Sequence, residues 1–134
     1  MENIFVARIM STDVYTVSPD TLVEDAAQAM LDEGIGSVLV VDDDEKLEGI
    51  LTTSDFVRIV AKSHPKAETA VSRYMTEEVI TTSAQAQITD AAATMATYDV
   101  THLPVVDDED GLIGMITATD LANYLSSAEL TSPA

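Results

Sequence analysis

Apolar and polar residues form two kinds of pattern along the chain, a helical spacing and short apolar runs. Residues 21–33 carry apolar side chains at helical spacing, which predicts a helix with one apolar face. The spaced positions are Leu22, Val23, Ala26, Ala27, Met30 and Leu31. Residues 37–41 and 103–106 are short, almost wholly apolar runs, typical of buried strands. Helices and strands are therefore expected in alternation.

The predicted elements occur in the same order in both halves of the chain. Each half should have a short amphipathic lead, a strand, a helix, two strands and a last helix. In the first half these are 5–10, 14–17, 21–33, 37–41, 47–51 and 53–62, and in the second 70–75, 79–82, 86–98, 103–106, 112–116 and 118–126. The first long helix should start at a capping box, Thr21 to Glu24, and stop at Gly34. Residues 63–69 should be a linker and 127–134 a frayed tail.

A shift of 65 residues aligns 8–60 with 73–125 without a gap. The clearest matched phrases are GILTTSD at 49–55 and GMITATD at 114–120. Such a period indicates a duplication. We therefore expect an α+β fold of two tandem β-α-β-β-α repeats packed about a pseudo-two-fold axis. The first repeat should span 1–66, with its core at 8–60, and the second 67–134, with its core at 73–125.

The charge balance limits the partners. The chain has 24 acidic and 6 basic residues, a net charge of −18, and 46% apolar residues, which argues for a folded acidic body. Nucleic acids and anionic membrane surfaces would be repelled, so neither is an expected partner. The acid-rich surface favours adaptation to a salt-rich cytoplasm, as in halophiles, against the alternative of an ordinary acidic protein. A cytoplasmic location is the simplest expectation, because the chain has no Cys and no apolar leader or span.

The repeated phrase places chemistry at a helix start. Thr52 and Asp55, and equally Thr117 and Asp120, stand where a strand passes into a helix. A helix N-terminus presents unpaired N–H groups that suit a phosphate, and a carboxylate accepts hydrogen bonds from vicinal hydroxyls. This combination fits a nucleotide. The competing interpretation is that Thr and Asp only cap the helix.

The phrases and their surroundings resemble a tandem pair of CBS domains, the module named after cystathionine β-synthase. The resemblance rests on GSVLVVDDDEKLEGILTTSDF (36–56), VTHLPVVDDEDGLIGMITATDL (100–121), and the leads RIMSTDVYTVSP and RYMTEEVITTSA. It covers about 5–125 and implies a Bateman module with two clefts between the repeats. Such modules commonly bind AMP, ADP, ATP or S-adenosylmethionine. The expected role is regulation by an adenosyl ligand, with no catalysis and no required cofactor or metal.

The resemblance also implies roles for single residues. Asp55 and Asp120 would contact ribose, and Thr52 and Thr117 phosphate, with Ser54 and Thr119 as secondary candidates. The adenine would lie in apolar slots formed by Thr16, Val17, Ile35, Gly36 and Ser37 in the first copy, and by Thr81, Thr82, Val100, Thr101 and His102 in the second. Each cleft should join the adenine slot of one repeat to the Thr and Asp of the other.

Departures from the family pattern bear on the ligand. Basic groups near the expected phosphate positions are scarce. Arg58, one helical turn after Asp55, either reaches the phosphate or lies on a solvated helix face. Its counterpart in the second repeat is Asn123. His102 either contacts the ligand or only lines the cleft. The acidic field disfavours a triphosphate and favours a monophosphate, a magnesium-bound nucleotide or the cationic S-adenosylmethionine. We rank AMP first, S-adenosylmethionine second and ATP third.

Two other classes of function compete with the sensor. A scaffold or interaction module would have the same fold with empty clefts. An enzyme would need a catalytic pair, for which Asp25 and Asp90 are the candidates, but their matched helical positions favour a surface or cap role. The family also suggests a homodimer and an unknown regulated protein as partners. The helix residues suited to a dimer contact are Phe56, Ile59, Val60, Leu121, Tyr124 and Leu125.

Overall fold

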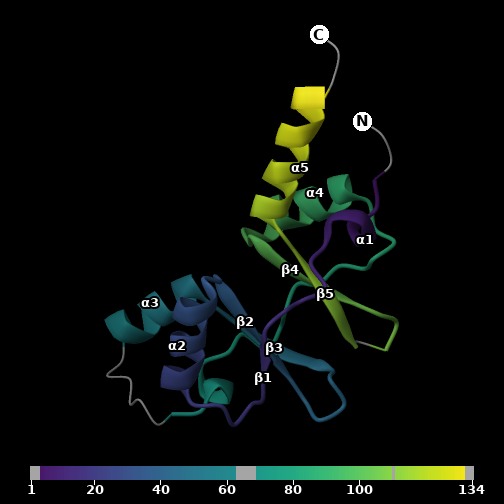
Figure 1. The fold of residues 1–134 in the computed structure, drawn as a ribbon. Helices are drawn as coiled ribbons and strands as arrows, with labels where there is room; N and C mark the ends of the chain where they lie inside the picture. Colours follow the sequence, from purple (N-terminus) through teal and green to yellow (C-terminus); the bar gives the residue numbers. More distant parts are fainter. Residues whose placement is uncertain (1–3, 63–68, 110, 132–134) are drawn as a thin grey trace. The chain divides into compact units, whose positions relative to one another are not determined.

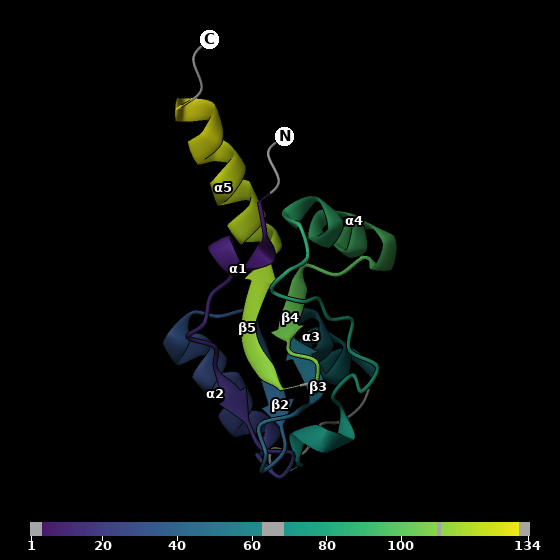
Figure 2. The same ribbon diagram turned by 90° about the vertical axis from the view of Figure 1, so that its right-hand side faces the viewer.

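The computed structural model describes residues 4–62, 69–109 and 111–131. The elements run α1 (Val6–Ile9), β1 (Thr16–Val17), α2 (Val23–Glu33), β2 (Ser37–Val41), β3 (Leu47–Thr52), α3 (Thr53–Lys62), the 3₁₀ helix η1 (Val71–Arg73), α4 (Ile88–Tyr98), β4 (His102–Val106), β5 (Leu112–Thr117) and α5 (Ala118–Thr131) (Figures 1 and 2). The α+β class and the tandem repeat are confirmed, and the β-α-β-β-α order is found complete in the first repeat. The predicted linker lies almost wholly outside the described residues.

The chain forms two compact units. One consists of residues Tyr15–Val79, and the other joins Met1–Val14 to Ile80–Ala134. The segment that precedes the first strand of each repeat therefore belongs to the unit of the other repeat. Sequence repeats and compact units are thus two different divisions of the chain. The repeat limits 1–66 and 67–134 stay a prediction, and their boundary lies outside the described residues.

Backbone hydrogen bonds fix both leading segments. Ser11 and Met115 exchange two N–H···O bonds, of 2.8 and 2.9 Å. In the other unit Thr76 and Ile50 do the same, at 2.9 and 3.1 Å. Each contact runs beside a glycine, Gly114 in β5 and Gly49 in β3, where an added Cβ would meet Ser11 O at 2.8 Å and Met75 Sδ at 2.5 Å. Glycine at these positions lets the leading segment approach the strand closely.

The Tyr15–Val79 unit is built on a three-stranded sheet in the order β1-β2-β3. β1 runs parallel to β2, and β2 runs antiparallel to β3 with a register shift between Val40 and Val41. Helices α2 and α3 share one core with the sheet, and removal of this apolar surface from water stabilises the unit. The buried members are Val23, Ala26, Met30, Val38, Val40, Leu51, Ile59 and Val71.

The second unit has a two-stranded sheet, β4-β5, and its predicted first strand at 79–82 is wrong. Thr82 makes only an isolated parallel bridge to Val105. In the first unit the corresponding ladder includes a hydrogen bond from Leu39 N to Tyr15 O, 3.3 Å long. The residue equivalent to Leu39 is Pro104, which has no N–H to donate. The ladder is therefore one bond shorter, and Thr82 alone remains paired.

The helix ends differ from expectation at two places. The capping box at Thr21 is wrong: α2 has Leu22 as its N-cap without a side-chain bond, and Thr21 Oγ1 instead accepts the Ser18 N–H at 3.2 Å. The frayed tail predicted at 127–134 is wrong for residues 127–131, because α5 continues to Thr131, and its last three residues lie outside the described residues. The stop at Gly34 is confirmed by its left-handed φ of 65°, and Asp99 takes the same conformation, φ 54°, at the end of α4. Gly and Asp both tolerate this region better than most residues.

Candidate functional site

Both repeated phrases lie at the junction of a strand with a helix, as predicted. Thr52 ends β3 and Thr53 begins α3, while Thr117 ends β5 and Ala118 begins α5. The helix start is tied to the neighbouring strand: Thr53 N donates to Gly36 O at 3.1 Å, and Ala118 N donates to Thr101 O at 2.9 Å. Each junction is therefore held against the residues that lead into β2 or β4.

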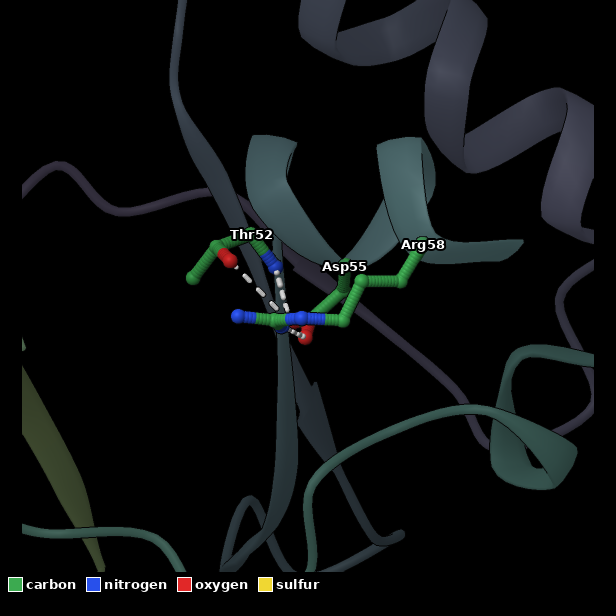
Figure 3. Close-up of polar contacts among 3 residues, drawn as sticks. All are labelled: Thr52, Asp55 and Arg58. Atoms are coloured by element: carbon green, nitrogen blue, oxygen red, sulfur yellow. Dashed lines mark hydrogen bonds and ion pairs between the residues drawn. The ribbon is translucent and has the colours of Figure 1, made fainter. Parts of the chain in front are cut away.

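In the first junction, both oxygens of Asp55 are engaged (Figure 3). Oδ2 accepts hydrogen bonds from Thr52 N at 2.8 Å and from Thr52 Oγ1 at 3.1 Å. Oδ1 accepts from Arg58 Nη1 at 3.0 Å, which makes an ion pair one helical turn apart. The Asp55 side chain is 17% exposed and that of Arg58 63%. The Arg58 end of this pair lies in solvent, so the pair itself contributes little stability.

The second junction keeps the cap and lacks the cation. Asp120 Oδ2 accepts from Thr117 N at 2.9 Å, and Thr117 Oγ1 accepts from Asp120 N at 3.1 Å. This is a reciprocal capping box. Asn123 stands where the first junction has Arg58. Within the described residues, no arginine or lysine pairs with Asp120.

The cap and the ligand interpretation are compatible in geometry. In both junctions the cap uses Oδ2 of the aspartate, and Oδ1 is not part of it. A carboxylate has about four acceptor positions, so one capped oxygen leaves acceptors for ligand hydroxyls. The cap also fixes the carboxylate direction before any ligand arrives. The capping interpretation from the sequence is thus confirmed as a structural role, and the binding role stays a prediction.

His102 is the titratable group that distinguishes the second junction. It pairs with Thr117 across the β4–β5 ladder, and its Nδ1 lies 3.0 Å from Thr101 Oγ1. Burial lowers the pKa of His102, and the charge of Asp120 opposes that shift in part. The imidazole is therefore mainly neutral at pH 7. Its counterpart is Ser37, a small buried residue that pairs with Thr52.

The structure brings most of the adenine-slot candidates near the junction of the same unit. Ile35, Gly36 and Ser37 lead into β2 beside Thr52, and Val100, Thr101 and His102 lead into β4 beside Thr117. The remaining slot candidates are Thr16 and Val17, which form β1 beside Leu39 and Val40, and Thr81 and Thr82, of which Thr82 bridges to Val105. Ser54 and Thr119 are exposed in the first turns of α3 and α5. The cleft that joins one repeat to the other stays a prediction.

Sequence reasoning did not foresee that Arg58 pairs with Asp55. The signal was present, because residues three apart on a helix are neighbours. In the part of the chain that the structure describes, no three His, Cys, Asp or Glu side chains form a candidate ion site. None of the described helices is long and apolar enough to cross a membrane.

Comparison with known proteins identifies the family to which the chain belongs. The sequence model of the CBS domain family matches residues 6–62 and 71–127. The CBS domain-containing protein YhcV of Bacillus subtilis is 32% identical over 119 residues, which are 88% of this chain and 84% of YhcV. A homoserine O-acetyltransferase of Methanosalsum zhilinae is 36% identical over 131 residues, 98% of this chain, but the chain spans only 26% of that enzyme.

A solved structure is similar over nearly the whole fold. It is the CBS domain pair of protein MJ0100, in complex with 5′-methylthioadenosine and S-adenosyl-L-methionine. The TM-score is 0.86 at 25% identity, and the match covers 94% of this chain and 98% of that one. Fold, duplicated sequence and family match agree. The chain belongs to the CBS domain family, as a tandem pair of CBS repeats.

Proposed function

We propose that this CBS pair is a regulatory module that binds an adenosyl ligand at its Thr–Asp junctions. The observation that carries the proposal is the duplicated geometry: each aspartate is held by Thr N–H at a helix start, with Oδ1 outside the cap. The similar MJ0100 pair, crystallised with two adenosyl compounds, supports this ligand class. The ribose hydroxyls would donate to Asp55 or Asp120, and Thr52 or Thr117 would contact the 5′ group.

The ligand carries little negative charge in this proposal. A net charge of −18 raises the cost of bringing a triphosphate to the protein, and Arg58 is the only cation paired at either junction within the described residues. We rank AMP first, S-adenosylmethionine second and ATP third. Salt reduces these differences, because the Debye length falls to about 3 Å at 1 M. The preference for AMP and S-adenosylmethionine over ATP should therefore be steepest at low ionic strength.

Calorimetric titration of the full chain with AMP, ADP, ATP and S-adenosylmethionine tests the proposal. Asp55→Ala and Asp120→Ala are the site variants, and Asp25→Ala, on the surface of α2, is the matched control for loss of one carboxylate. We expect saturable binding of at least one ligand, weakened by one or both site variants and unchanged by Asp25→Ala. Absence of binding of all four ligands in both low salt and roughly 1 M KCl would reject the sensor.

A scaffold with empty clefts is the second candidate, and the capping bonds favour it. Thr52, Asp55, Thr117 and Asp120 all have a structural role without a ligand. A scaffold predicts that partner capture by the protein is the same with and without adenosyl compounds. A homodimer and a regulated protein remain part of the sensor proposal. Catalysis is not proposed, since the enzyme relatives share only the segment matched by this chain.

A further inference from the structure

The two Thr–Asp junctions differ in the charge that surrounds the aspartate. In the first, Asp55 forms an ion pair with the guanidinium of Arg58 at 3.0 Å. In the second, the position of Arg58 is taken by Asn123, and the imidazole that leads into the junction, His102, is kept mainly neutral by burial. The first junction thus has an aspartate with its own counter-ion, and the second an aspartate without one among the described residues.

We propose that the two junctions select adenosyl ligands of different charge: the Asp55–Arg58 junction takes a 5′-phosphate such as AMP, and the Asp120–Asn123 junction takes an adenosyl group without phosphate. This assignment rests on the proposed function and names the ligand class of each of its sites. It makes Arg58 and Asn123 the residues that determine specificity.

The first half of the assignment follows from the exposure of Arg58. Its side chain is 63% exposed, whereas Asp55 is only 17% exposed and is fixed by two bonds from Thr52. A guanidinium with this freedom can leave Oδ1 of Asp55 for a phosphate oxygen, to which it binds in bidentate fashion. Oδ1 then becomes available to a ribose hydroxyl. Phosphate and ribose are thereby accommodated by one rearrangement of a single side chain.

The second half follows from uncompensated charge. A phosphate that enters beside Asp120 brings its negative charge next to the carboxylate, with Asn123 in place of a cation. A neutral 5′-thioether or a cationic sulfonium adds no such repulsion, and a sulfonium gains attraction. His102 also replaces the small Ser37 at the strand that faces the junction. The second junction is therefore suited to a ligand with an uncharged or positive 5′ group.

The test uses calorimetry of the full chain with two probes that differ mainly in charge, AMP and 5′-methylthioadenosine. We expect both to bind at once, so that saturation with one leaves the heat of the other intact. Arg58→Gln should weaken the binding of AMP about tenfold or more, which is the effect of losing a hydrogen bond to a charged group. The affinity for 5′-methylthioadenosine should stay unchanged. Lys46→Gln, an exposed cation in the β2–β3 turn, is the matched control. Asn123→Arg should create a second AMP site.

The outcomes separate this assignment from the proposed function. Binding of neither probe rejects both. If the two probes compete for one site, the assignment is rejected and the proposed sensor function stands. The same follows if Asp120→Asn and Asp55→Asn each weaken the binding of both probes equally. Unchanged AMP affinity in Arg58→Gln also overturns it. The Asn variants keep an oxygen acceptor for the cap, and thermal unfolding of each variant confirms that lost binding is not lost folding.

Discussion

The two units of the molecule share the pairing of their antiparallel strands, and a few of the many positions at which their sequences differ change the structure or the charge of a unit. β2–β3 and β4–β5 pair in the same register, including the shift at Val40–Val41 and at Val105–Val106. Yet the first sheet has a third strand where the second has one bridge, and the first junction has an ion pair that the second lacks. The strand pairing is common to both units, and the pairs Leu39/Pro104 and Arg58/Asn123 account for these two differences.

Leu39→Pro should make the first sheet lack the same N–H donor as the second. Of the changes considered, it should lower the free energy of unfolding most. Leu39 is fully buried, and its N–H donates to Tyr15 O at 3.3 Å. The substitution removes that bond from a central strand and also loses apolar volume, so we expect a loss of about 3 kcal/mol or more in the free energy of unfolding. Urea denaturation measures it. Leu39→Ala controls for lost volume, and a proline variant as stable as the alanine variant would contradict the role of this N–H.

Gly114→Ala and Gly49→Ala compare the two leading segments. At Gly114 the new Cβ would lie 2.8 Å from a backbone atom, Ser11 O, whereas at Gly49 the closest atoms are Sδ and Cγ of Met75, at 2.5 and 2.7 Å, which belong to a flexible side chain. Both should be destabilised by about 1–3 kcal/mol through overpacking, and Gly114→Ala more than Gly49→Ala.

The midpoint of urea unfolding ranks these two variants. Gly34→Ala provides a control, because nothing lies within 4 Å of its Cβ position and its cost comes from the left-handed φ of 65°. The reverse order for Gly114 and Gly49 would mean that Met75 is held more rigidly than the backbone at Ser11.

Much of this architecture follows from the hydrophobic pattern, and the failures have identifiable physical causes. The buried strand at Ser37–Val41 and the helix ends at Gly34 and Lys62 were predictable, since periodicity and a left-handed stop specify them locally. The absence of a strand at 79–82 was not predictable from the apolar pattern, because that pattern does not show that Pro104 lacks an N–H donor. The prediction for the tail failed because residues 127–131 have only one large apolar side chain, Leu130, yet the first helix breaker, Pro133, comes only after them.

The candidate site was predictable in position and not in detail. Repetition and the Thr-x-x-Asp spacing placed Thr52 and Asp55 at a helix start. The sequence does not say which carboxylate oxygen the cap uses, because this depends on the rotamers of two side chains. The capping box at Thr21 failed for a related reason: its hydroxyl also has a local partner at Ser18, and that alternative prevailed.

The two caps should differ in their dependence on the threonine hydroxyl. Thr117 Oγ1 accepts the Asp120 N–H, so Thr117→Ala leaves a helix donor without its partner and should cost about 1 kcal/mol. Thr52 Oγ1 instead donates to Asp55 Oδ2, which keeps the bond from Thr52 N, so Thr52→Ala should cost less. Thermal or urea unfolding measures both, with Thr→Ser at each position as the rescue. Equal losses would show that both hydroxyls act alike in solution.

The smallest expected effect concerns His102, which has no titratable counterpart in the first unit. Burial, opposed in part by Asp120, lowers the pKa of His102 in the folded protein below the usual value of 6.5. The unfolded chain therefore binds a proton more readily, and the contribution of His102 to stability is complete above pH 6.5 and declines as the pH falls through that value toward the folded pKa. His102→Ser, which copies Ser37, removes this dependence. Between about pH 8 and 5.5 the urea midpoint of the variant should therefore fall less than that of the wild type. Because every other titrating group is common to the two proteins, a constant difference across this range would mean that the pKa of His102 is the same in the folded protein as in the unfolded chain.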